Sequence, residues 1–312
     1  MCIRDRYYSL LPKRSIMIFL IGSIVLTSYL LLSFKVCGKL NIPVYPAIVF
    51  NYITCVITGS VVNGSFPIQS ESIATPWFRW AMIMGLLFIT SFNLIGMTAQ
   101  KLGVAVASVA NKLSLIIPVI LTIILYNEQV VGWEIVGISL ALIAVIFTCY
   151  PKPNESENAD SVPFLQKVLL PLLVFIGSGF LDALINHVQQ TYVTKETNNA
   201  FLIAGFFSAA TIGLMVLLYQ YWKKQLVFKF NQVVAGICIG IPNYFSIWCL
   251  VHFLQDSPWE TSASLPVNNM GIVLFSTLVA AMLFKEKLSI INWIGIALSG
   301  IAIYLIAFGN TL

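Results

Sequence analysis

Apolar stretches of nearly membrane-spanning length, separated by short polar links, run through this sequence from residue 16 to residue 309. A transmembrane α-helix needs roughly 20 mainly apolar residues, and about ten stretches come near that length. They cover residues 16–35, 43–62, 77–99, 103–125, 131–150, 168–192, 200–222, 232–254, 261–283 and 290–309. Irregular backbone cannot face lipid, because its N–H and C=O groups would stay unpaired. The sequence therefore predicts an all-α integral membrane protein with about ten transmembrane helices. We expect it to be a multi-pass protein of the inner cell membrane.

Charged residues are scarce in this chain. They make up 9% of the 312 residues, while 59% are hydrophobic, and a soluble domain averages about 25% charged residues. This composition excludes an ordinary soluble enzyme and a disordered chain. The net charge of +5 predicts no binding to nucleic acid, because the basic residues are scattered over short links and form no stripe.

Several chemical motifs are absent from the sequence. It contains no GxxxxGK(S/T) phosphate loop, no HExxH zinc motif, no GxSxG nucleophile motif and no TVGYG-like ion filter. Its six cysteines form no CxxC pair and are expected to be small buried hydrophobic residues. We therefore expect a protein that is not an enzyme, needs no cofactor and binds no metal ion.

One long polar link, 151–167, divides the chain into two halves, 16–150 and 168–309. The link is rich in Pro, Asn, Ser and acidic residues, which is typical of a solvated connector. An N-terminal tail, 1–15, precedes the first apolar stretch. That stretch lacks an A-x-A cleavage site and is followed by many others, so we expect an uncleaved helix and not a signal peptide.

The two halves resemble each other, most clearly near their ends. Shifts along the chain that superpose the halves pair polar residues of the same type: Asn93 with Asn243, Asn111 with Asn269, and Glu128 with Glu286. Each half would hold an odd number of helices, about five, so the second copy must be inverted in the membrane. Inverted repeats are typical of secondary transporters, whose substrate site lies near the midplane between the copies.

The ends of both halves also resemble the end of an EamA domain. In the second half, Leu283–Ser289 is followed by the glycine-containing run Gly295–Gly300, and in the first half Leu125–Glu128 is followed by Gly137. The resemblance implies two EamA-like copies, one in each half, as in the drug/metabolite transporter superfamily. It also implies uptake or export of small metabolites and cytoplasmic termini. The Lys13-Arg14 pair before the first stretch agrees with such termini, whereas the count of basic residues in the links favours the opposite orientation.

Polar side chains within the apolar stretches are the candidates for a substrate site. A charge at the bilayer centre costs about 2.5–3.5 kcal/mol, and Lys112 and Asp182 lie deep in stretches of different halves. Each offers the other a deep partner of opposite sign, so we predict that they line one cavity. Asparagines that recur in both halves are favoured over the others. The candidate substrate-binding residues are Lys112, Asp182, Asn93, Asn111, Asn243 and Asn269.

Each candidate has a structural alternative. A lysine can bond to carbonyls of a neighbouring helix, and asparagines commonly hold membrane helices together. His187 and His252 are expected to be packing residues, and Glu128 and Glu286, at the edges of links, are expected to pair or cap near helix ends.

The sequence as a whole predicts a secondary transporter that works by alternating access. Small polar metabolites would be its substrates, with amino acids or related compounds first: Lys112 would meet a carboxylate, and Asp182 and the asparagines an amino group. The expected partners are a small-molecule substrate and the lipid bilayer, with no nucleic acid, and a homodimer stays open. An integral-membrane enzyme or a lipid-handling protein that uses the same central cavity is the alternative.

Overall fold

Helices account for almost all of the residues that the computed structural model describes, which are 13–118, 120–121, 132–148, 163–194, 196–225, 227–256, 261–285 and 288–308. They are α1 (Lys13–Lys39), α2 (Val44–Asn63), the 3-10 helix η2 (Ser70–Ala74), α3 (Pro76–Lys101), α4 (Val104–Leu113), α6 (Gly132–Thr148), α7 (Phe164–Thr191), α8 (Asn198–Trp222), α9 (Phe230–Asp256), α10 (Thr261–Phe284) and α11 (Ile290–Phe308). These described residues include no strand. The predicted all-α class is confirmed for this part of the chain.

Seven of the helices are long and apolar enough to cross a membrane. They contain the segments Ile16–Lys39, Val44–Asn63, Pro76–Lys101, Leu165–Gln189, Asn198–Trp222, Phe230–Leu254 and Val267–Phe284. Shorter apolar helices occupy Val104–Pro118, Ile135–Thr148 and Ile290–Leu305. Many apolar side chains are exposed, such as Ile57 and Phe180, as expected of surfaces that meet lipid. A multi-pass membrane protein is the class that fits these helices.

The helix α7 begins within the segment 151–167 that was predicted as the connector. Pro163 precedes the first residue of α7, and α7 begins at Phe164, so the last residues of the predicted connector belong to this helix. Proline is well tolerated at the start of a helix, because the N–H group that it lacks would have no acceptor within the helix there. Residues 151–162 lie outside the described residues, as do Glu128 and Glu286.

The helix α4 is interrupted in the middle of its apolar stretch. It ends at Leu113, a turn follows at Ser114, and one helical turn resumes at Ile116. Pro118 explains the break, because it has no N–H to donate to the carbonyl of Ser114 four residues earlier. The Ser114 carbonyl instead accepts from the N–H of Ile117 at 2.9 Å. The break lies directly after two of the candidate residues, Asn111 and Lys112.

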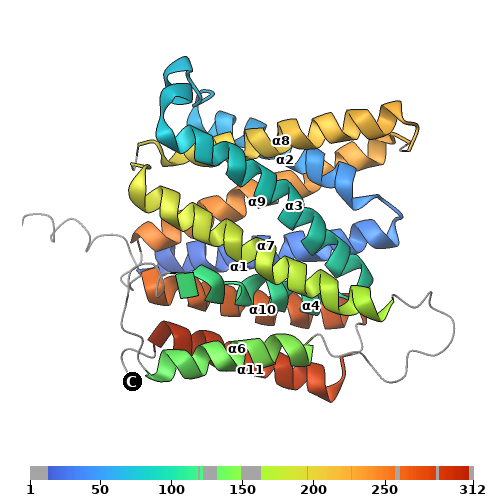
Figure 1. Cartoon of the computed structure of the whole chain (residues 1–312), viewed down its shortest axis with the longest axis vertical. Helices are drawn as coiled ribbons and strands as arrows, with labels where there is room; N and C mark the ends of the chain where they lie inside the picture. The colour runs from blue at the N-terminus through green and yellow to red at the C-terminus, as the bar shows by residue number, and fades with distance from the viewer. Residues whose placement is uncertain are drawn as a thin grey trace, which may run out of the picture.

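The helices pack in a crossed arrangement in which each half contacts the other extensively. The pairs with the most extensive packing between halves are α2 with α9, α3 with α8, α1 with α9, α3 with α7, and α6 with α11. Figure 1 shows α6 and α11 side by side at one edge of the bundle, where they meet α4 and α10. The core between the remaining helices is aromatic at its centre, where the buried ring of Tyr52 packs against Phe88, Phe92 and Phe206.

Glycines allow α2 and α9 to approach closely. A Cβ atom on Gly236 would collide with Phe50, and a Cβ on Gly240 would lie 2.5 Å from Thr54 Cβ and 2.7 Å from the Asn51 carbonyl oxygen. Gly236 and Gly240 thus form a small-xxx-small contact of α9 with α2. Gly295 serves the same purpose between α11 and α6, where its Cβ would lie 2.5 Å from the backbone nitrogen of Thr148.

We expect Gly240→Ala to destabilise the protein by about 1–3 kcal/mol, because α2 and α9 must move apart to admit the methyl group. The measurement is the melting temperature of the purified protein in detergent. Gly132→Ala is the matched control, since a Cβ on Gly132 meets no atom within 4 Å. Equal melting temperatures for the two variants would contradict the close contact.

Candidate functional site

The structure brings the two predicted charges together. Lys112 lies in the last turn of α4, Asp182 lies in the middle of α7, and these two helices pack against each other. The ammonium and the carboxylate interact electrostatically. Within the described residues, no ion pair within 4 Å joins them. The two charges are therefore neighbours across a helix interface, without direct contact.

The carboxylate of Asp182 is weakly satisfied by its neighbours. Ser114 Oγ lies 3.4 Å from Asp182 Oδ2 and 2.5 Å from the carbonyl oxygen of Asn111. One hydroxyl has one hydrogen to donate, and the shorter contact takes it. Asp182 is also exposed. It lies two residues after the outward-facing Phe180, which corresponds to about 200° around the helix, so the two side chains are on opposite sides of α7. Its carboxylate thus has capacity to accept further hydrogen bonds on the inner side of α7.

Asn51 and Asn243 form a buried contact between the halves. Asn243 Nδ2 donates to Asn51 Oδ1 at 3.1 Å, and the two residues are 1% and 0% exposed. Among the residues that the structure describes, Asn51 Nδ2 has no hydrogen-bond partner. Asn243 follows Pro242 inside α9, so a helix with a disturbed backbone is tied to α2 at this point. This contact fits the helix-holding role that was the structural alternative for Asn243.

The remaining candidates differ in their surroundings. Asn93 donates through Nδ2 to the Ile89 carbonyl of its own helix at 2.6 Å, so it does not repeat the contact of its sequence mate Asn243. Asn111 and Asn269 are both partly buried. Their helices α4 and α10 pack together, and Ser276 Oγ donates to Ser108 Oγ at 2.9 Å within that contact.

The bundle is closed at the α1–α3 end, where these helices finish at Lys39 and Lys101. Lys35 Nζ donates to the Gln100 carbonyl at 3.3 Å, and Gln100 Nε2 donates to the Phe34 carbonyl at 3.1 Å. The rings of Phe34 and Phe92 meet edge to face with centroids 6.3 Å apart. These contacts bind the ends of α1 and α3 to each other.

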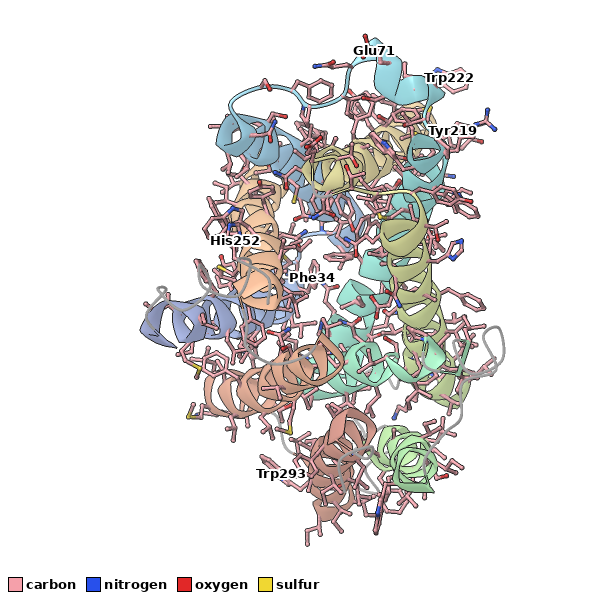
Figure 2. The ribbon with its side chains drawn as sticks, turned by 90° about the vertical axis from the view of Figure 1, so that its left-hand side faces the viewer. Phe34, Glu71, Tyr219, Trp222, His252 and Trp293 are labelled. Carbon is pink, nitrogen blue, oxygen red and sulfur yellow. The ribbon has the colours of Figure 1, made fainter. Side chains whose placement is uncertain are left out.

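The opposite end of the bundle, where α7 and α9 finish at Thr191 and Asp256, is arranged differently. Among the described residues, α7 and α9 do not form a packed pair. Figure 2 looks at this end and shows α7 and α9 on opposite sides of the bundle centre, with Phe34 between them in the view. The helices are therefore joined at the α1–α3 end and separated at the α7–α9 end.

A cavity of about 300 Å³ lies near the α7–α9 end, between α2, α8 and α9; we call it the side cavity. Its lining consists of Val62, Asn63, Asn199, Leu202, Ile203, Phe206, Tyr244, Ile247, Trp248, Val251 and His252. None of the six predicted site residues lines it. Figure 2 places His252 on the side of α9 that faces away from the bundle centre.

Sequence reasoning missed the side cavity, although α9 carries a signal for it. Tyr244, Trp248 and His252 recur at every fourth position, so they form one aromatic stripe along the helix. His252 was expected to be a packing residue, and it does pack: its ring lies 4.0 Å from that of Trp248 and 5.4 Å from that of Phe19. It also lines the cavity, which the expectation did not include.

Comparison with known proteins adds information on the fold. No family model matches the chain. A protein of Haemophilus influenzae, described as uncharacterized, is 27% identical over 297 residues, which is 92% of this chain and 96% of the relative. A crystal structure of a protein with 15% identity superposes with a TM-score of 0.56 and covers 94% of this chain and 97% of the solved one. The chain thus shares its fold, over nearly its full length, with a protein of known structure.

Proposed function

We propose that the protein is a secondary transporter, with the two-copy architecture of EamA-like drug/metabolite transporters, that moves small polar metabolites by alternating access. Amino acids and related zwitterions are the first class to test, and the inner cell membrane is the proposed location. Lys112 and Asp182 would meet the substrate's opposite charges. This proposal involves a small-molecule substrate and the lipid bilayer as partners, with no catalytic step.

The pattern of helix packing is the observation that carries the proposal. We let α1, α2, α3, α4 and α6 correspond in order to α7, α8, α9, α10 and α11. Exchanging the corresponding helices then turns each of the packed pairs below into a pair that is also packed, which we call its mate. The pair α2–α9 matches α8–α3, and α1–α9 matches α7–α3. The pairs α2–α8, α4–α10 and α6–α11 are their own mates. Two inverted copies related by a two-fold axis in the membrane plane produce this pattern.

The departure from that symmetry supports alternating access. The pair α1–α3 is packed, whereas its mate α7–α9 is not packed in the described residues. A single change that exchanges the two arrangements would open the α1–α3 end and close the α7–α9 end. Such exchange between copies is the movement by which inverted-repeat transporters carry substrate past a fixed site.

Substrate counterflow in proteoliposomes is the test. Vesicles that contain the purified protein and one unlabelled amino acid should take up the same labelled amino acid faster than empty vesicles, and a panel of amino acids and nucleosides should identify the class. The internal solute must be recovered chemically unchanged. Conversion of the solute would favour the membrane-enzyme alternative, and the absence of counterflow for every solute of the panel would reject the proposed class.

A further inference from the structure

The side cavity includes aromatic rings in its lining, and these rings pack against one another and against residues outside the cavity. Trp248 packs edge to face against Phe19, with centroids 5.6 Å apart, and tilted against His252. Phe206, on the α8 wall, packs against Tyr52 and Phe88 of the core. Ligand pockets have volumes of roughly 300–1,000 Å³, and the side cavity reaches the lower bound. A preorganised aromatic cavity of this size suits a flat ring system of one or two rings.

The hydrogen bonds of His252 fix which of its nitrogens can act on a ligand. Its Nδ1 lies 2.9 Å from the Trp248 carbonyl oxygen, and a carbonyl only accepts, so Nδ1 carries the hydrogen. In the neutral ring, Nε2 is then an acceptor. Within the described residues, Nε2 has no hydrogen-bond partner. The cavity wall therefore offers an acceptor next to the Trp248 ring.

The polar groups of the cavity are neutral. The described lining residues include no Asp, Glu, Lys or Arg. Asn63 uses Nδ2 to donate to the Ser65 carbonyl at 3.3 Å, which leaves its Oδ1 as a further acceptor at the rim. Apolar walls with neutral polar groups favour an uncharged ligand, since a charged ligand would lose its hydration without a partner. The acceptors of His252 and Asn63 favour a ligand that has an N–H group at its edge.

We infer that the side cavity binds a neutral, planar nitrogen heterocycle that carries an N–H donor, with the ring against Trp248 and the N–H donating to His252 Nε2. The inference does not require that the protein transports anything. It concerns a place distinct from Lys112 and Asp182, so binding and counterflow can fail independently of each other.

Indole and 1-methylindole are the probes, because they share the ring and differ in the N–H group. Binding of each radiolabelled probe is measured on the full chain in lipid nanodiscs, with empty nanodiscs subtracted. We expect saturable binding of indole and at least about fivefold weaker binding of 1-methylindole, which corresponds to one neutral hydrogen bond. Lys112→Ala should leave indole binding unchanged.

Variants separate the ring contact from the hydrogen bond. Trp248→Leu should weaken both probes about tenfold, in the range of one lost aromatic contact, while Trp248→Phe should retain most of the affinity. His252→Phe keeps a ring and removes the acceptor, so the affinity for indole should fall to that for 1-methylindole. Trp222→Leu, at a Trp that is 78% exposed and does not line the cavity, is the control.

Three results would overturn the inference. The first is the absence of saturable indole binding to the wild-type protein. The second is equal affinity for indole and 1-methylindole in the wild type, which would remove the hydrogen bond. The third is displacement of indole by decanol at concentrations where 1-methylindole has no effect, which would identify the cavity as a niche for lipid chains.

Discussion

Replacing Lys112 with alanine should abolish counterflow while the protein remains in the membrane at wild-type amounts. Lys112 lies near the middle of the predicted apolar stretch 103–125, and its ammonium interacts electrostatically with Asp182 across the α4–α7 contact. Without it, a substrate carboxylate loses its counter-charge in a medium where an isolated charge costs about 2.5–3.5 kcal/mol. A loss of that size corresponds to a reduction of about 100-fold in binding. Counterflow per molecule of reconstituted protein is the measurement.

Lys101→Ala is the matched control for this variant. Lys101 is exposed at the end of α3, where its Nζ donates to Gln166 Oε1 at 3.2 Å, and an exposed contact of this kind contributes little. Adding Asp182→Ala to Lys112→Ala should restore thermal stability more than transport, because it removes the carboxylate left without a counter-charge. Wild-type counterflow by Lys112→Ala and by Asp182→Ala, each as a single variant, would show that the two charges only serve packing.

Asn243→Leu should lower the stability of the protein by about 1–3 kcal/mol, which is the cost of a buried polar group left unpaired. The substitution removes the donor to Asn51 Oδ1, and Asn51 Nδ2 already has no partner. The buried Asn51 amide would then keep only the weak contact with Cys55 Sγ, which lies 3.8 Å from Asn51 Oδ1. Thermal unfolding in detergent, followed by the loss of the monodisperse peak in size-exclusion chromatography, measures the effect.

Asn93→Leu is the matched control, because Asn93 occupies the corresponding place in the first half but donates only to its own helix. We expect a smaller destabilisation from it. The double variant Asn51→Leu with Asn243→Leu should recover part of the lost stability, since neither amide is then buried alone. If Asn93→Leu were as damaging as Asn243→Leu, the contact between the halves would not be the reason.

The positions of the helices could be predicted from the sequence because lipid leaves few alternatives. Apolar stretches bounded by Pro43, Gly64 and Gly103 become helices that begin or end near those residues. The backbone at Gly64 and Gly103 has positive φ angles of 77° and 108°, which glycine adopts without strain. The ends of α1 and α7 were less predictable, since charged residues such as Lys39 can extend a helix beyond its apolar part.

The site was only partly predictable, because helix registry depends on contacts between segments far apart in the chain. The proximity of Lys112 and Asp182 followed from the cost of isolated charges. The different surroundings of Asn93 and Asn243 did not follow from their matched positions, because the α7–α9 end is separated and the α1–α3 end is joined. The stripe of Tyr244, Trp248 and His252 was visible, but nothing in the sequence showed that α2 and α8 leave a space beside it.

The break in α4 has an electrostatic consequence for the charged pair. A helix carries roughly half a negative elementary charge at its C-terminus, on carbonyls that lack intrahelical partners. Because α4 ends at Leu113, this negative pole lies inside the predicted apolar stretch 103–125, with Lys112 in the last turn of the helix. The backbone therefore adds a second negative potential near the ammonium, beside the attraction of Asp182. A cationic group that approaches Asp182 would meet this negative pole as well.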